Sequence, residues 1–106
     1  MNSLNSIDDI KDFIKDNKFV MLYFSSEGCN VCDDILPMLE ELLKKHSEVV
    51  SGHVQVQNLP TVASFFGIFT IPAIVLLLEG KEILRQARYI NFSELKEQIQ
   101  RFSEFV

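Results

Sequence analysis

The stretch YFSSEGCNVCDDILPMLEELLKK, residues 23–45, decides the fold class and holds the only two cysteines of the chain, Cys29 and Cys32. Apolar residues recur at helical spacing after the cysteines, which predicts a helix over residues 29–45. The preceding apolar run, residues 19–24, is rich in strand-forming residues and predicts a buried strand. The two thiols therefore fall where a strand passes into the first turn of a helix.

Outside this stretch, strands and helices continue to alternate. Apolar periodicity, capping residues and turn signals define the remaining elements. These are helices over residues 7–17 and 61–66, strands over residues 49–57, 73–78 and 82–89, and a last helix that opens at Asn91 and reaches Phe102. The order predicts an α/β fold with a mixed sheet, in which parallel crossovers come first and a hairpin comes last.

Composition and charge narrow the classes of function. A chain of 106 residues that is 47% hydrophobic and 24% charged predicts one globular domain over residues 1–106. The net charge of −5 argues against a nucleic-acid or anionic-membrane surface, because both need basic patches. The longest apolar run, residues 71–78, is too short to span a membrane. The first residues lack the basic segment and the following apolar segment of a signal peptide, so we expect a cytoplasmic protein.

The position of the cysteine pair predicts redox chemistry. At a helix start, unpaired N–H groups and the helix dipole favour a thiolate, which makes Cys29 the nucleophile. Cys32 lies one turn along and would resolve the mixed disulfide that Cys29 forms with a partner. Two other interpretations stay open, namely that both cysteines are buried core residues or that they form half of a zinc site. Zinc needs about four ligands, and His46 and His53 show no paired ligand spacing.

Several motifs resemble the thioredoxin family across almost the whole chain. They are GCNVC after an apolar strand, a proline five residues after the second cysteine, GIFTIP before another apolar strand, and the turn EGKE. The resemblance implies a thioredoxin fold, a mixed central sheet flanked by helices on both faces, and reduction of protein disulfides by Cys29 and Cys32. A reductase or a low-molecular-weight thiol would supply the electrons, and neither a metal nor an organic cofactor is expected.

The resemblance also implies roles for a glycine and two prolines near the pair. Pro37 matches a proline that kinks the active-site helix, because it cannot donate a hydrogen bond to the carbonyl of Asp33. Pro72 matches the family's cis-proline, so the Ile71–Pro72 bond would be cis and Ile71 would offer backbone groups to a substrate strand. Gly28, just before the pair, would belong to the same substrate-binding surface.

The sequence departs from the family's usual pattern at several positions. The typical Trp-Cys-Gly-Pro-Cys is replaced by GCNVC at residues 28–32, and the chain has no tryptophan. Tyr23 replaces a buried carboxylate, His53 replaces the lysine that faces it, and Arg88 replaces a glycine of the substrate-binding loop. We expect His53 to point to the same side of the sheet as Tyr23, to hydrogen-bond its hydroxyl, and to accept the proton of Cys32. The alternative is a half-buried histidine satisfied by a neighbour.

Side chains around the pair also have alternative explanations. Three acids lie close to it in sequence: Glu27, Asp33 and Asp34. They are favourably placed in a first helical turn, or they raise the pKa of Cys29 and favour cationic partners. We expect Phe65, Phe66 and Phe69 mostly in the core, although Phe69 would otherwise line the rim of the site. The alternative function is a non-enzymatic module that holds a partner in the cleft near Pro72.

Overall fold

Strands and helices alternate in the computed structural model, which describes the backbone of residues 1–106 and every side chain except that of Ala63. In chain order the elements are β1 (Asn2–Ser3), α1 (Ile7–Asp16), β2 (Phe19–Ser25), α2 (Asn30–Lys44), β3 (Val50–Gln55), the 3₁₀ helix η1 (Val56–Asn58), α3 (Thr61–Phe66), β4 (Ala73–Leu78), β5 (Lys81–Ala87) and α4 (Phe92–Ser103). Of the helices described, none combines the length and the apolar character that a membrane crossing requires.

The strands form one mixed sheet in the order β1-β3-β2-β4-β5. β1, β3 and β2 run parallel, whereas β4 lies antiparallel to β2 and β5 lies antiparallel to β4. β2 is central, and all 7 of its residues are buried. A strand that is buried on both faces needs a continuous apolar run, which residues 19–24 supply. The predicted mixed sheet, with its final hairpin, is confirmed.

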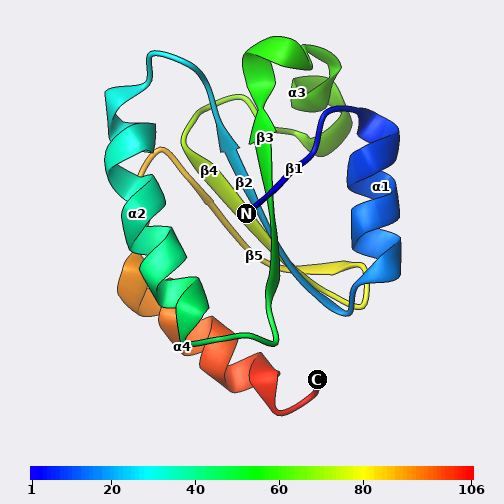
Figure 1. Cartoon of the computed structure of the whole chain (residues 1–106), viewed down its shortest axis with the longest axis vertical. Coiled ribbons are helices and arrows are strands. Elements are labelled where there is room, and N and C mark those ends of the chain that lie inside the picture. Colours follow the sequence, from blue (N-terminus) through cyan, green and yellow to red (C-terminus); the bar gives the residue numbers. More distant parts are fainter.

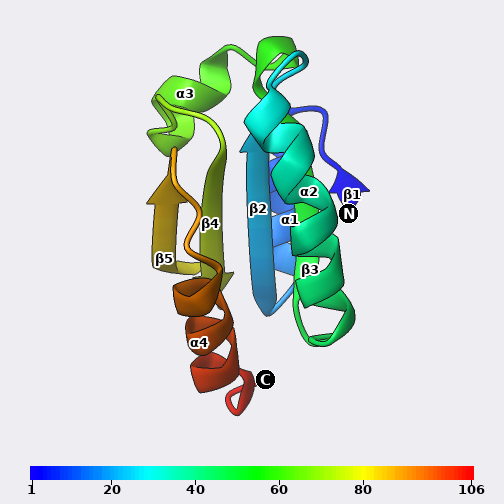
Figure 2. The ribbon, with the colours of Figure 1, turned by 90° about the vertical axis from the view of Figure 1, so that its left-hand side faces the viewer.

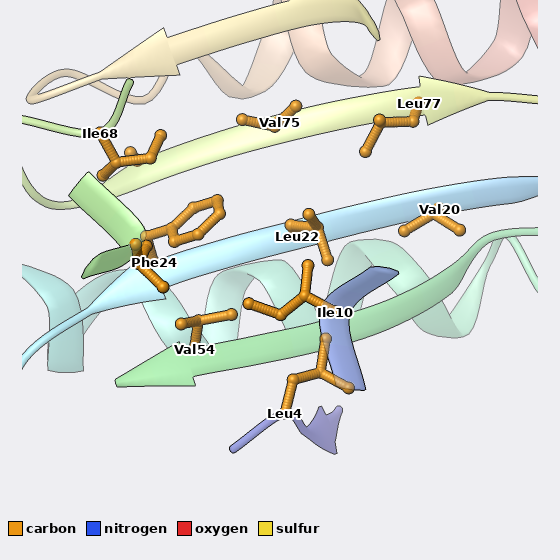
Figure 3. Close-up of a cluster of buried hydrophobic side chains, with 11 residues drawn as sticks. Leu4, Ile10, Val20, Leu22, Phe24, Val54, Ile68, Val75 and Leu77 are labelled. Atoms are coloured by element: carbon orange, nitrogen blue, oxygen red, sulfur yellow. The ribbon is translucent and has the colours of Figure 1, made fainter. Parts of the chain in front are cut away.

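Helices cover both faces of this sheet, as Figure 1 shows. On the face of α1 and α3, Leu22 and Phe24 of β2 pack in one cluster with Ile10 of α1 (Figure 3). On the opposite face, Met21 and Tyr23 pack in a second cluster with apolar residues of α2 and α4. Burial of each large apolar side chain contributes about 1.5–3 kcal/mol. The two clusters therefore fix the helices to the sheet and set the position of the α2 N-terminus.

Local boundaries differ from the sequence-based prediction at three places. β1 was not predicted, because two residues that pair with Gly52 and His53 of β3 carry no hydrophobic pattern. The strand predicted over residues 49–57 ends at Gln55, where the chain turns into η1. The strand predicted over residues 82–89 is β5, which starts at Lys81 and ends at Ala87, so Arg88 and Tyr89 lie beyond it.

Candidate active site

Four chain segments meet at one end of the sheet, the upper end in Figure 2. These are the end of β2, the start of α2, the start of β4 and the end of β5. β2 and β5 run toward this end, whereas β4 starts from it because it is antiparallel to both of them. The topology therefore brings the cysteine pair, Pro72 and the loop after β5 to the same end of the molecule.

The cysteine pair lies at the N-terminus of α2 and is joined by a disulfide between Cys29 and Cys32, with their Cα atoms 5.2 Å apart. Gly28 has a φ of +81°, a left-handed conformation that glycine adopts without steric cost. Cys29 is the N-cap residue, and its Sγ accepts a hydrogen bond from the backbone N–H of Cys32 at 3.2 Å. Cys29 is partly exposed, whereas Cys32 is only 2% exposed. A partner molecule therefore reaches Cys29 before Cys32.

Charges around the pair come from both the helix and its neighbours. The N-terminus of α2 presents unpaired N–H groups and the positive end of the helix dipole to the Cys29 sulfur. Glu27, Asp33 and Asp34 are all exposed near this terminus. Their carboxylates oppose the stabilisation of a thiolate, although solvent screens exposed charges. Stabilisation of a Cys29 thiolate therefore depends mainly on the helix end.

The start of β4 forms the other side of the site. The Ile71–Pro72 bond is cis, Pro72 is buried, and Ile71 is partly buried. Sheet pairing of β4 with β2 and β5 begins at Ala73, so the backbone groups of Ile71 are outside the ladder. The backbone N–H of Arg88 donates to the carbonyl of Pro72 at 2.8 Å, which ties the loop after β5 to the start of β4.

Tyr23 and His53 lie side by side beneath α2. They occupy paired positions on the parallel strands β2 and β3, and their rings stack with centroids 5.3 Å apart. The expectation that both point to one side of the sheet is therefore met. The expected hydrogen bond between them is wrong, because the Tyr23 hydroxyl donates to the carbonyl of Cys32 at 2.7 Å. Burial, with a smaller effect of Asp33, raises the pKa of Tyr23 to about 12, so Tyr23 stays protonated near neutral pH.

Ser25 is a polar residue of the site that the sequence did not reveal. It is 4% exposed, and its Oγ lies 2.6 Å from Nε2 of His53. Burial, and then the positive N-terminus, lower the pKa of His53, while Glu40 partly offsets them. The only sequence signal for Ser25 was its position two residues after Tyr23, which places both side chains on one face of a strand. His53 is thus half-buried with a hydroxyl partner, and its role in proton transfer stays a prediction.

Two exposed apolar side chains form what we call the apolar rim: Val31, between the cysteines, and Phe69, in the segment before Pro72. Phe69 is 81% exposed and Val31 is 54% exposed. A pocket of about 300 Å³ is lined by Val56, Leu59, Pro60, Ile68, Phe69 and Ile71. The expected core placement is wrong for Phe65, which is 51% exposed, and for Phe69, whereas Phe66 packs against the core. The short helix α3 can bury only one face against the sheet.

Two remaining expectations concern Pro37 and metals. Pro37 lies inside α2, which continues from Asn30 to Lys44, so the chain accommodates a proline that cannot donate to Asp33. The kink itself stays a prediction. Within the part of the chain whose side chains are described, no three His, Cys, Asp or Glu residues gather as a metal ion would require.

Comparisons with known proteins agree with this geometry. The family model described as "Thioredoxin" matches residues 4–101. Thioredoxin-like protein YdfQ of Bacillus subtilis (strain 168) is 37% identical over 101 residues, which cover 95% of this chain and 90% of that protein. A thioredoxin of Chlamydia caviae is 35% identical over 66 residues, or 62% of this chain and 65% of that protein. The X-ray structure of Fasciola hepatica thioredoxin matches with a TM-score of 0.86 and 29% identity, covering 95% of this chain and 98% of that one. The chain belongs to the thioredoxin family, and its Cys29–Cys32 pair makes it a thiol–disulfide oxidoreductase in general terms.

Proposed function

We propose that the protein reduces disulfide bonds of other proteins through a Cys29/Cys32 dithiol. The observation that carries this proposal is the placement of the two thiols. Cys29 caps α2 and is partly exposed, whereas Cys32 is 2% exposed one turn along the same helix. One accessible sulfur and one shielded sulfur suit two successive exchange steps.

In the first step, the Cys29 thiolate attacks one sulfur of the substrate disulfide. A bond forms between Cys29 and that sulfur, the substrate S–S bond breaks, and the other substrate sulfur leaves as a thiolate that takes a proton from water. The backbone N–H of Cys32, which donates to the Cys29 sulfur at 3.2 Å in the oxidised protein, would stabilise the negative sulfur of the reduced protein. Such a hydrogen bond to the charged form lowers a thiol pKa.

In the second step, the Cys32 sulfur attacks Cys29 and releases the second substrate thiolate. Two electrons have then passed to the substrate, and the Cys29–Cys32 disulfide seen in the structure has formed. Cys32 must lose its proton for this step. We assign the proton acceptor to His53, acting directly or through water, because the neighbouring Tyr23 stays protonated up to about pH 12.

The apolar rim supports a protein substrate over a small disulfide. Val31, between the cysteines, and Phe69, shortly before Pro72, expose apolar surface, and the pocket lined by Ile71 offers a place for an apolar side chain. Ile71 would pair with an extended substrate segment, since its backbone groups lie outside the ladder of β4. A reductase or a low-molecular-weight thiol would regenerate the dithiol, in the cytoplasm, where thiols are kept reduced.

The same rim supports a second candidate, a module that binds partners without redox turnover. The two functions differ in what Cys29 does. We expect the wild-type protein to catalyse reduction of insulin disulfides with dithiothreitol as electron donor, and Cys29→Ser to fall to the uncatalysed rate. Alkylation of Cys29 should also be fast near neutral pH. A slow Cys29 with no turnover would instead favour the binding module.

A further inference from the structure

Arg88 adopts a backbone conformation that most residues avoid. Its φ is +71°, and the backbone N–H of Tyr89 donates to the carbonyl of Ala87 at 2.9 Å, so Arg88 is the central residue of a tight γ-turn. Such a turn with positive φ is rare and strained. Glycine would occupy the position without steric cost, and strained non-glycine residues cluster at functional sites. The strained backbone therefore suggests a function for the side chain of Arg88.

Two anchors hold Arg88 beside the site. On one side its own backbone N–H donates to the carbonyl of Pro72 at 2.8 Å. On the other side the buried Gln86 receives the N–H of Asn91 at 3.0 Å and donates to the carbonyl of Asn91 at 3.1 Å. The turn is thus fixed at both ends, so little conformational entropy remains to be lost when the loop meets a partner.

Arg88 is an exposed residue, so its side chain is available to a partner. Among the described side chains, the salt bridges involve Lys18, Lys44, His46 and Arg85 but not Arg88. Arg85, the other arginine of this hairpin, already pairs with Glu82 at 2.8 Å. In a chain of net charge −5, Arg88 is a cation on the β5 side of a site whose α2 side is acidic.

We propose that Arg88 determines specificity by binding a carboxylate side chain of the disulfide substrate, close to the cysteine that Cys29 attacks. The proposal rests on the proposed function. A guanidinium presents a planar fork of donors that matches a carboxylate with two parallel hydrogen bonds. The acidic side formed by Glu27, Asp33 and Asp34 would repel the same carboxylate, so the two signs together orient the substrate segment across the site.

Blocked disulfide peptides that differ in one residue test this directly. In three peptides with acetylated and amidated ends, the residue beside the target cysteine is Glu, Gln or Lys. We expect the reduced wild-type protein to react about fivefold faster with the Glu peptide than with the Gln peptide, as an exposed ion pair allows. Arg88→Gly should bring that ratio to about one. Arg88→Glu, which keeps a side chain at the strained position, should prefer the Lys peptide.

Two control variants test whether relief of backbone strain or loss of a positive charge elsewhere changes the ratio of rates. Glu79→Gly relieves the other non-glycine residue with positive φ, at the opposite end of the sheet. Arg101→Gln removes one cation from α4. Both should keep the wild-type ratio of rates, and added salt should shrink that ratio. A wild-type protein that reduces all peptides equally, or an Arg88→Glu variant with an unchanged ratio, overturns the proposal while the proposed function stands. If no peptide is reduced, the proposed function fails and the proposal fails with it.

Discussion

At the scale of single residues, Tyr23 and His53 lie at paired strand positions but differ in what they can do near neutral pH. Burial raises the pKa of Tyr23 to about 12, so its hydroxyl serves as a donor to the carbonyl of Cys32. Burial lowers the pKa of His53, so its imidazole stays neutral, and able to accept a proton, to a lower pH than an ordinary histidine. Tyr23 positions the first turn of α2, and we propose His53 as the base.

A pH profile of the second step tests this role of His53. The rate at which Cys32 resolves a mixed disulfide should fall as the pH drops through the lowered pKa of His53, because the protonated imidazole accepts no proton. The charged groups that influence His53 are the N-terminus, which lowers its pKa, and Glu40, which raises it. In His53→Gln, resolution should be slower over about pH 6 to 8 and should lack that titration. The rate is measured by rapid quenching of a preformed mixed disulfide.

A second histidine offers the matched control. His46 follows the C-terminal end of α2 and pairs with Glu48, so His46→Gln removes a histidine away from the cysteines. It should keep the wild-type profile. An unchanged resolution rate in His53→Gln over the same pH range would leave His53 with a purely structural contact to Ser25.

At the scale of elements, a polar network around the buried Gln86 joins β5 to the exposed start of α4. Gln86 is 7% exposed, accepts from the N–H of Asn91, and donates to the carbonyl of Asn91 and to Glu94. Gln86→Leu would leave these groups without their partner, at a cost of about 1–3 kcal/mol in the free energy of unfolding. The loop that holds Arg88 should also loosen. Urea denaturation measures the first effect, and amide hydrogen exchange of residues 88–91 measures the second.

A variant at Asn91, the exposed N-cap residue of α4, separates the contribution of this network from that of helix capping. Asn91 also accepts the N–H of Glu94 through its side chain, and Asn91→Ser should keep that function at little cost because serine is an equally good N-cap residue. If Gln86→Leu unfolded no more easily than Asn91→Ser, the network would contribute nothing beyond the cap.

At this scale, the sequence predicts those features whose pattern lies within a few neighbouring residues. The helices, the central strand and the site of Cys29 and Cys32 follow from patterns within a few residues, so they were predictable. The partner of Ser25 depends on the register between β2 and β3, and the partner of the Tyr23 hydroxyl depends on how α2 packs over the sheet. Neither partner can be predicted from a local sequence pattern. The exposure of Phe69 was equally hidden, because it depends on where the short helix α3 ends.

At the scale of the whole molecule, we expect the arrangement of charges to set the direction of electron flow. Asn30 and Val31, between the cysteines, carry no charge, and the nearby side chains at the start of α2 are acidic. A strongly stabilised thiolate is what makes such a protein an oxidant. We therefore expect a reduction potential clearly below about −120 mV, the value for a strong oxidant. Equilibration with glutathione measures it, and a strongly oxidising value would contradict this electrostatic argument.

Trapping of partner proteins by single-cysteine variants tests the roles of the two thiols most directly. Cys32→Ser should form mixed disulfides through Cys29 with disulfide-bonded proteins, because attack remains and resolution is lost. Cys29→Ser should trap none, because its remaining thiol is only 2% exposed. Mass spectrometry of the trapped species identifies the sulfur that is linked. Partners held by Cys32 in Cys29→Ser, with none held by Cys29 in Cys32→Ser, would show that the roles are reversed.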